Sequence, residues 1–294
     1  MKPPVPLTSY ALLFASMSLV GSYVALSKPL VAALPIFLLA WLRFGIGALA
    51  MFRHTLPARL AELDRPTWRA LFLQSFFGNF LFSICMLNGV ARTSVTAGGM
   101  ILASLPAVVA LFSWWLLKER PAARTLAAVG LAAAGISTLA LAKDPGGHMS
   151  ALGNLLMLGA VCCEALYVVI GKSLAGRLPA LSVSALINLI GLALTTPFGI
   201  WQAVGFDFSG VRPGIWLLLL FYALGASVFS VWLWMSGLKK VPASHAGVFT
   251  IALPLASTAI GVLFLGERPA LAHGIAFARA VGGILLTTKP SPRG

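Results

Sequence analysis

Charged residues are scarce in this 294-residue chain: Asp, Glu, Lys and Arg together make up 10% of it, whereas they make up about a quarter of soluble domains. Only seven residues are acidic, and they are scattered, so no acidic cluster is available to hold a metal ion. The three cysteines all lie within apolar runs, which argues against a disulfide framework. We therefore expect neither a metal site nor a disulfide-stabilised fold.

Enzyme signatures are also missing from the sequence. It contains no Walker phosphate-binding motif, so this chain alone is not expected to drive transport with ATP, and it contains no HExxH zinc motif. The G-x-S-x-G motif of many hydrolases is absent as well. These absences favour a protein that is not an enzyme and that needs no cofactor.

Apolar sequence is abundant: 59% of the residues are hydrophobic, and the mean hydropathy is +0.95. A bilayer core needs about 20 apolar residues per helix, and such runs follow one another with only short polar breaks. We therefore predict an all-α integral membrane protein of ten transmembrane helices. Their approximate ranges are Leu7–Leu26, Leu34–Phe52, Trp68–Asn88, Val95–Leu117, Leu126–Leu141, Ala151–Ile170, Leu181–Ala203, Gly214–Ser236, Ala246–Leu265 and Leu271–Thr287.

The formal net charge of +14 is distributed among the loops in a way that indicates orientation. With the N-terminus placed in the cytoplasm, fourteen of the 21 Lys and Arg residues fall on the cytoplasmic side and five on the other. Arg43 and Arg279 fall inside predicted helices. An excess of basic residues in short cytoplasmic loops is typical of membrane proteins. We predict that both termini are cytoplasmic and that nucleic acid is not a partner.

The chain contains an internal repeat. Ser94–Pro121 aligns without gaps on Pro242–Pro269, which places Pro106 on Pro254 and the Glu-x-Pro ends of the two stretches on each other. The same alignment places Asn79 on Ser227. A slightly smaller offset aligns Tyr23 of the first predicted helix with Tyr167 of the sixth, and Lys28, just after the first, with Lys172, just after the sixth.

The repeat predicts two units, residues 1–146 and 147–294. Each unit holds five predicted helices, an odd number, so the second unit must enter the membrane with the opposite polarity. Inverted repeats are a common construction of secondary transporters, in which a substrate site lies between the two halves. This pattern favours a transporter.

Two long motifs carry a family resemblance. The run NGVARTSVTAGGMILASLPAVVALFSWWLLKERP, from Asn88 to Pro121, resembles a segment of the EamA-type exporters of the drug/metabolite transporter superfamily. The run SGLKKVPASHAGVFTIALPLASTAIGVLFLGERP, from Ser236 to Pro269, is similar to the same segment. The resemblance implies two five-helix bundles around a central cavity. Glu164 departs from the family, many of whose members carry an aromatic residue there.

The resemblance is nearest to bacterial amino-acid and metabolite exporters. It implies a secondary transporter that moves a small metabolite, an amino acid or a related compound, out of the cell by alternating access. The partners would be the small-molecule substrate, the lipid bilayer of the bacterial inner (plasma) membrane and, as a candidate coupling ion, protons. A monomer and a homodimer are both compatible with the sequence. The alternative is an intramembrane enzyme that acts on a lipid-linked substrate.

Polar and aromatic residues recur at helical spacing in the third and eighth predicted helices. Such stripes suit a cavity with a few hydrogen-bonding groups among aromatic walls. The alternative is interhelical packing, in which Ser and Asn bond between helices and Phe faces lipid. The candidate substrate-binding residues are Phe76, Asn79, Ser83, Ser227, Ser230 and Trp234, with Tyr167 added from the repeat and the resemblance.

Pro106 and Pro254 interrupt apolar helices at equivalent positions of the two units. Proline removes a backbone donor and kinks a helix, and paired interruptions point to the working centre of a transporter. The alternative is that proline is simply tolerated in membrane helices. We interpret the pair as gating kinks.

Ionisable residues within the predicted helices must have a partner or reach water, because an uncompensated charge there costs several kcal/mol. Glu164 and His245 map toward the cytoplasmic end and form a candidate proton-coupling pair. A structural ion pair, or a neutral hydrogen-bonded Glu164, is the alternative. Arg43 and Arg279 are interpreted as packing groups that stabilise the bundle.

Overall fold

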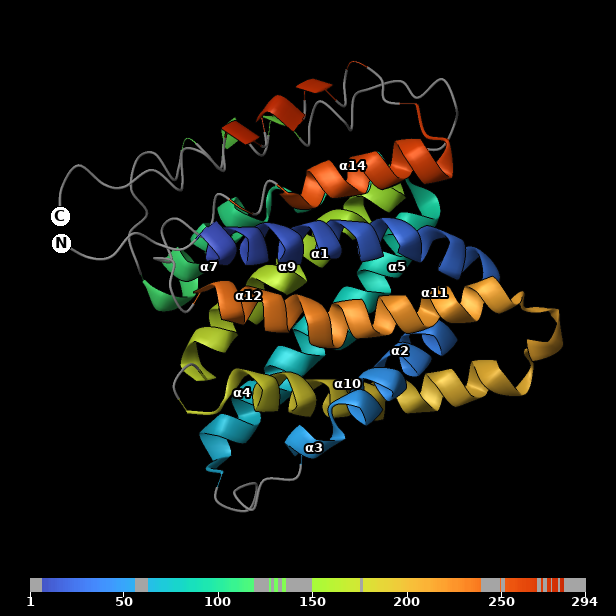
Figure 1. Cartoon of the computed structure of the whole chain (residues 1–294). Coiled ribbons are helices and arrows are strands. Elements are labelled where there is room, and N and C mark those ends of the chain that lie inside the picture. Colours follow the sequence, from blue (N-terminus) through green and yellow to red (C-terminus); the bar gives the residue numbers. More distant parts are fainter. Residues whose placement is uncertain are drawn as a thin grey trace.

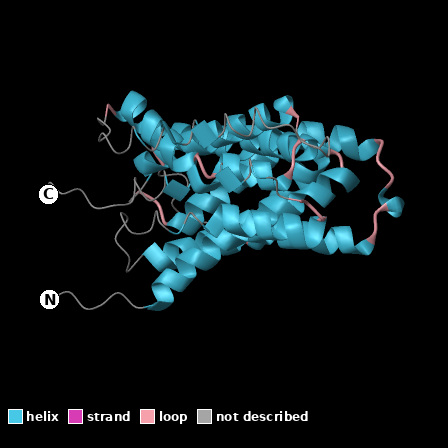
Figure 2. Cartoon of the chain, turned by 90° about the horizontal axis from the view of Figure 1, so that it is seen from above, coloured by secondary structure: helices cyan, strands magenta, loops and turns pink. Residues whose placement is uncertain are grey.

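The computed structural model describes residues 7–55, 63–118, 150–174, 177–238 and 252–268, together with residues 127, 130, 131, 134, 135, 249, 271, 274, 275, 277–279, 281 and 282. Within this part of the chain the regular structure is helical and no strand occurs (Figure 1). Seen from above, helices make up most of the drawn body (Figure 2). The apolar runs of the sequence therefore form a helical bundle.

The described helices agree in place with eight of the ten predicted ranges; the ranges near 126–141 and 271–287 lie largely outside the described residues. Their bounds are α1 Leu7–Ala33, α2 Ile36–Ala50, α3 Phe52–Thr55, α4 Arg65–Ser75, α5 Phe82–Arg92, α6 Val95–Leu102, α7 Leu105–Leu117, α9 Ala151–Leu174, α10 Ala180–Val204, α11 Pro213–Leu224, α12 Ser230–Leu238 and α14 Ala252–Leu265, with the π-helices η2 Phe76–Leu81 and η4 Gly225–Phe229 and the 3₁₀-helix η3 Phe208–Gly210.

Five helical segments of the described chain are long and apolar enough to cross a membrane. They are Leu7–Ala33, Arg65–Arg92, Ala151–Gly171, Leu181–Val204 and Pro213–Trp234. A sixth candidate is the pair formed by α6 and α7, which is bent by 41° at its break. The helices α2 and α14 are apolar but shorter. Multiple membrane spans are thus supported by length and composition.

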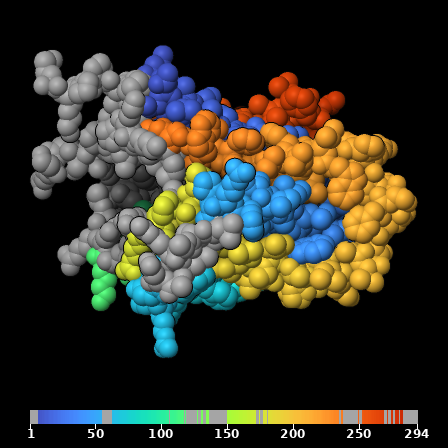
Figure 3. Space-filling model, turned by 60° about the horizontal axis from the view of Figure 1, so that its bottom comes forward, coloured from blue at the N-terminus to red at the C-terminus, as the bar shows by residue number. Residues whose placement is uncertain are grey.

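Helices from the two halves of the chain pack against each other. The closest associations join α1 to α14, α2 to α10, and α5 to α9, and in Figure 1 α1 lies between α14 and α12. Figure 3 shows α2, in light blue, seated between α10 and α11 on the face turned to the viewer. Each of these pairs brings a helix from before residue 146 against one from after it, so the core is built by both halves together.

Large apolar side chains cover the outside of the bundle as well as its core. Phe44, Met86 and Tyr222 are fully buried, whereas Trp201 is 73% exposed and Phe264 71% exposed. A soluble protein seldom exposes apolar side chains over so much of its surface, but a lipid-facing surface requires them. The exposed apolar side chains of the long helices are therefore consistent with a surface in contact with lipid.

The connections between helices gather at two ends of the bundle. At one end, the backbone N–H of Ser150, before α9, donates to the carbonyl of Arg92, the last residue of α5, at 3.2 Å. At the other end, Arg177 donates to the Thr67 hydroxyl at 3.1 Å, which joins the α9–α10 connection to the first turn of α4. Asp64 caps that turn by accepting from the Thr67 N–H at 3.0 Å.

Gly21 lets α1 approach α14 at its first turn. A Cβ at this position would collide with the carbonyl of Leu253 and lie 3.0 Å from the Cβ of Ala256. Because a backbone carbonyl cannot move away as a flexible side chain can, only glycine fits here.

We expect Gly21→Ala to destabilise the protein by about 1 to 3 kcal/mol, because overpacking forces the two helices apart. The measurement is the thermal unfolding midpoint of the purified protein in detergent. Gly214→Ala is the matched control, since a Cβ on Gly214, in the first turn of α11, meets nothing within 4 Å. Equal midpoints for the two variants would contradict the close approach of α1 and α14.

Candidate functional site

A buried arginine lies in the middle of the bundle. Arg43, on α2, is 7% exposed, and its Nη1 donates to the Ser83 hydroxyl of α5 at 3.0 Å. Its guanidinium carbon is 4.5 Å from the ring centroid of Phe44 and 5.5 Å from that of Tyr222 on α11. The Arg43 Nε has no hydrogen-bond partner among the described residues. The guanidinium thus rests on aromatic rings and keeps free hydrogen-bonding capacity.

Two tyrosines lie beside this arginine, and a third lies beside Tyr23 and Glu164. Tyr23 of α1 packs edge-on against Tyr222, with the ring centroids 5.8 Å apart, and both interact electrostatically with Arg43. Tyr167 of α9 interacts electrostatically with Tyr23 and with Glu164. The Tyr222 hydroxyl is fully buried and makes no hydrogen bond of good geometry with any described residue.

Glu164, also on α9, faces the same cluster. It is partly exposed and interacts electrostatically with Arg43 and with two of the tyrosines. Neither of the ion pairs described for the structure involves it, so its carboxylate lies more than 4.0 Å from the guanidinium nitrogens of Arg43. The structure therefore holds a buried positive and a nearby negative charge that do not touch.

Two π-helices occur at equivalent positions of the repeat. Asn79 lies in η2 and Ser227 in η4, and both side chains bond to adjacent residues of α10. The Asn79 amide donates to the Ile187 carbonyl at 2.7 Å, and the Ser227 hydroxyl donates to the Asn188 side-chain carbonyl at 2.9 Å. Short π-helical turns within α-helices often mark functional sites. Asn79 and Ser227, which are aligned in the repeat, thus lie in π-helical turns at equivalent positions of the two halves.

The other predicted substrate-binding residues have partners within the protein. Phe76 lies in an aromatic row with its neighbours Phe72 and Phe80, at centroid distances of 6.2 and 5.8 Å. Ser230 donates to the carbonyl of Ala226 at 3.2 Å. Trp234 is partly buried and packs on Leu13, and Tyr167 packs on Gly78. A direct contact of any of these residues with substrate stays a prediction.

Pro106 is the second residue of α7 and lies at the bend between α6 and α7. A proline costs no backbone hydrogen bond in the first turn of a helix. Pro254 lies in α14, whose described part begins at Ala252. His245, the proposed partner of Glu164, lies outside the described residues. Arg279 donates to the carbonyl of Ala134 at 2.9 Å, as expected of a packing group.

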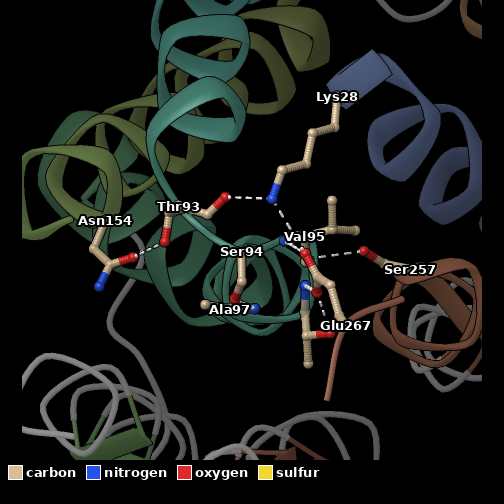
Figure 4. A network of polar contacts seen from close by, with 9 residues as sticks. Lys28, Thr93, Ser94, Val95, Ala97, Asn154, Ser257 and Glu267 are labelled. Atoms are coloured by element: carbon tan, nitrogen blue, oxygen red, sulfur yellow. Dashed lines mark hydrogen bonds and ion pairs between the residues drawn. The ribbon is translucent and has the colours of Figure 1, made fainter. Parts of the chain in front are cut away.

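A second polar network closes one end of the bundle (Figure 4). The carboxylate of Glu267, just after α14, accepts hydrogen bonds from the first turn of α6: from the Val95 N–H at 2.6 Å, and from the Thr96 N–H at 2.8 Å and hydroxyl at 2.7 Å. Lys28 of α1 donates to Glu267 at 3.3 Å and to the Thr93 carbonyl at 3.1 Å. We call Lys28, Glu267 and the Val95–Thr96 turn the end clamp.

The surroundings of Glu267 favour its charged form. Burial alone would raise the pKa of this carboxyl, but the hydrogen bonds from Thr96 and Val95 and the charge of Lys28 outweigh burial and hold the pKa below its usual value of 4.5. The positive end of the α6 helix dipole acts in the same direction. The end clamp therefore joins α1, α6 and α14 through one ionised group.

Comparison with known proteins decides the family. The EamA-like transporter family matches the chain twice, over residues 7–141 and residues 151–289. The chain belongs to the EamA-like transporter family. The two family matches correspond to the two copies of the internal repeat, so this EamA-like protein carries two repeats of the family's domain.

Among the relatives of this EamA-like protein are bacterial transporters. The uncharacterized transporter YetK of Bacillus subtilis (strain 168) is 34% identical over 284 residues, which cover 95% of this chain and 86% of that protein. The threonine/homoserine exporter RhtA of Escherichia coli (strain K12) is 29% identical over 304 residues, or 99% of this chain and 95% of that one. A solved crystal structure, 24% identical, shares the fold with a TM-score of 0.64 and 94% coverage of both chains.

Sequence reasoning missed three features of this EamA-like protein. It treated Arg43 as a packing group, although the guanidinium lies among the tyrosines with an unused donor. It did not single out Glu267 or Lys28 as a contact, although both belong to pairs that the repeat alignment brings out. The π-helical turns η2 and η4 could not be recognised from the sequence, where their one distinguishing feature is a glycine in each, Gly78 and Gly225.

We expect Glu267→Gln to destabilise the protein by about 1 to 3 kcal/mol near neutral pH, because two backbone donors and Lys28 lose a charged acceptor. The pKa of Glu267 is depressed, so its contribution is present above the usual value of 4.5 and is lost as the pH falls through the lower folded-state pKa.

The measurement is the thermal midpoint of both proteins between neutral pH and strongly acidic pH. The gap between wild type and Glu267→Gln should close on acidification. Asp207→Asn, which changes an exposed acidic residue in the α10–α11 connection, is the control and should leave the midpoint nearly unchanged. A gap that persists unchanged at every pH would contradict an ionised clamp.

Proposed function

We propose that this protein is a secondary transporter that exports an amino acid or a related small metabolite by alternating access. The observation that carries the proposal is the cluster of Arg43, Glu164 and three tyrosines, which come from helices of both halves of a chain that carries two transporter-family repeats. Export and amino-acid specificity follow the name of the relative RhtA.

The fold proposed for this function has ten transmembrane helices in two inverted five-helix units, residues 1–146 and 147–294, around a central cavity. The two family matches and the packing of first-half helices on second-half helices support it. The loop charges support cytoplasmic termini. The bacterial relatives support the inner membrane.

In this orientation the end clamp lies at the outer side of the membrane. Lys28 and Glu267 then hold the outer ends of α1, α6 and α14 together, so the clamp closes the outer mouth. The repeat alignment pairs them with Lys172 and Glu119, which would form the corresponding contact at the cytoplasmic mouth. Glu119 and the side chain of Lys172 lie outside the described residues.

The candidate residues from the sequence retain roles in this proposal. Asn79 and Ser227 bond to α10 and Ser83 bonds to Arg43 of α2, so these three residues hold the helices around Arg43 in place. The remaining candidates lie on helices of the same bundle and are proposed to line the cavity: Phe76, Tyr167, Ser230 and Trp234. Pro106, at the bend between α6 and α7, and its repeat equivalent Pro254 are the points at which we propose that the halves flex. Glu164 and His245 remain the candidate pair for proton coupling.

We expect the purified protein, reconstituted in liposomes, to exchange internal labelled L-threonine or L-homoserine for external unlabelled compound, and to accumulate it when a pH gradient is applied if protons are the coupling ion. The measurement is counterflow against a panel of the twenty protein amino acids and L-homoserine, with protein-free liposomes as control. Absence of exchange for every compound, by protein that is folded by thermal unfolding, would contradict amino-acid transport.

A further inference from the structure

We propose that Arg43 and Glu164 are the two poles of a binding site for a zwitterion: Arg43 binds the carboxylate of an α-amino acid and Glu164 binds its ammonium group. This inference rests on the proposed function, since it names the chemistry by which the substrate is recognised. Neither residue was assigned to substrate by the repeat or by the polar stripes of the sequence.

Arg43 has unused hydrogen-bonding capacity. A guanidinium has five N–H donors in a planar fork that matches a carboxylate. The side chain is 7% exposed, and among the described residues Ser83 is the one with which it makes a hydrogen bond of good geometry. The Tyr222 hydroxyl lies near the guanidinium, and Nε has no partner among the described residues. Buried polar groups without a partner are rare in native proteins, and a bound ligand is one explanation for them.

The two charges, Arg43 and Glu164, are close to each other but not in contact. Each charge in an apolar bundle is costly, and direct contact would compensate both. Arg43 and Glu164 interact electrostatically but are not an ion pair. An α-amino acid has a carboxylate and an ammonium group attached to the same carbon atom. It can therefore pair with Arg43 and Glu164 at once, although these two side chains do not contact each other.

Tyrosines lie beside each of the two charges. Tyr23 interacts electrostatically with both Arg43 and Glu164, Tyr222 does so with Arg43, and Tyr167 with Glu164. The buried Tyr222 hydroxyl lies near Arg43 and makes no hydrogen bond of good geometry among the described residues. Aromatic faces attract an ammonium group, and a phenol hydroxyl can donate to a carboxylate. Tyr23 and Tyr167 are equivalent in the repeat, so both halves contribute to the site.

This arrangement predicts the selectivity of the site. A compound with the ammonium group alone would leave the buried Arg43 without a charged partner, and a compound with the carboxylate alone would leave the partly exposed Glu164 without one. A site built to pair a polar group discriminates strongly against the analogue that lacks it, because its own buried group stays unsatisfied. Both charges of the ligand are therefore required.

The test is competition against counterflow of labelled L-threonine in proteoliposomes. The competitors are unlabelled L-threonine, 1-aminopropan-2-ol, which lacks the carboxylate, and 3-hydroxybutanoate, which lacks the amine. We expect each single-charge analogue to compete about 10- to 100-fold less well than L-threonine. This arm uses the wild-type protein, so it does not depend on whether a variant folds.

The variants Arg43→Gln and Glu164→Gln are expected to lose about 10- to 100-fold in apparent affinity for L-threonine in the same exchange. Arg177→Gln and Asp207→Asn, which change exposed charges at the two ends of the bundle, are the matched controls and should exchange as the wild type does. Thermal unfolding of each variant separates loss of binding from loss of fold.

The outcomes separate this inference from the proposed function. If Glu164→Gln exchanges L-threonine with the wild-type affinity, the proposed two-pole site is overturned. Glu164 would then remain only a candidate for proton coupling, because exchange needs no net proton movement. Equal competition by either analogue would overturn it while transport stands. If L-threonine is not exchanged but another amino acid of the panel is, the decarboxylated and deaminated analogues of that amino acid are used to test the two-pole site in the same way. If no compound is exchanged, the proposed function itself is refuted.

Discussion

The guanidinium of Arg43 is the constraint on which the centre of this bundle depends. A charge at this depth has to be solvated by protein, and here Ser83 and the rings of Phe44 and Tyr222 do so in part. Because α2 packs between α10 and α11, the guanidinium of Arg43, a residue of the first half, contacts the ring of Tyr222, a residue of the second half. The contact between the halves is therefore organised around one incompletely paired group.

The same constraint acts on the backbone. Hydrocarbon offers no hydrogen bonds, so any departure from the α-helix must be compensated by a neighbouring helix. The π-helical turns η2 and η4 meet α10, where Ile187 and Asn188 accept from Asn79 and Ser227. Ser75, one residue before η2, also donates to the Ile187 carbonyl, at 2.7 Å. The irregular turns thus occur where α10 provides side chains and carbonyls to bond with.

Much of the fold could be predicted from sequence, because hydropathy and repeats are properties of single residues and their spacing. The helices α1, α9 and α10 lie where apolar runs predicted them, and the repeat corresponds to two family matches. The extension of α1 to Ala33, past Lys28 and Pro29, was not predicted, because Lys28 was counted as a loop residue. In the structure its ammonium group is paired with Glu267, which allows the helix to continue.

The site was predicted less well, for a physical reason. Periodicity shows which face of a helix a residue occupies, but not whether its hydrogen bonds are completed by another helix. Asn79 and Ser83 were chosen because they are polar, and both turn out to bond to α10 and α2. Arg43 was interpreted as a packing group, and the three tyrosines beside Arg43 or Glu164 come from three different helices, which no local pattern could bring together.

The two charged networks of the molecule differ in how fully they are paired, and this difference separates their roles. The Glu267 carboxylate accepts from Val95, Thr96 and Lys28, so it needs nothing further and stabilises the contact it makes. Arg43 retains an unpaired donor beside a carboxylate that it does not touch. A satisfied buried charge holds helices together, whereas an incompletely satisfied one raises the free energy of the empty site and lowers it again when a complementary ligand arrives. This difference is the reason why we propose that the end clamp closes one mouth of the bundle and that the centre binds a ligand.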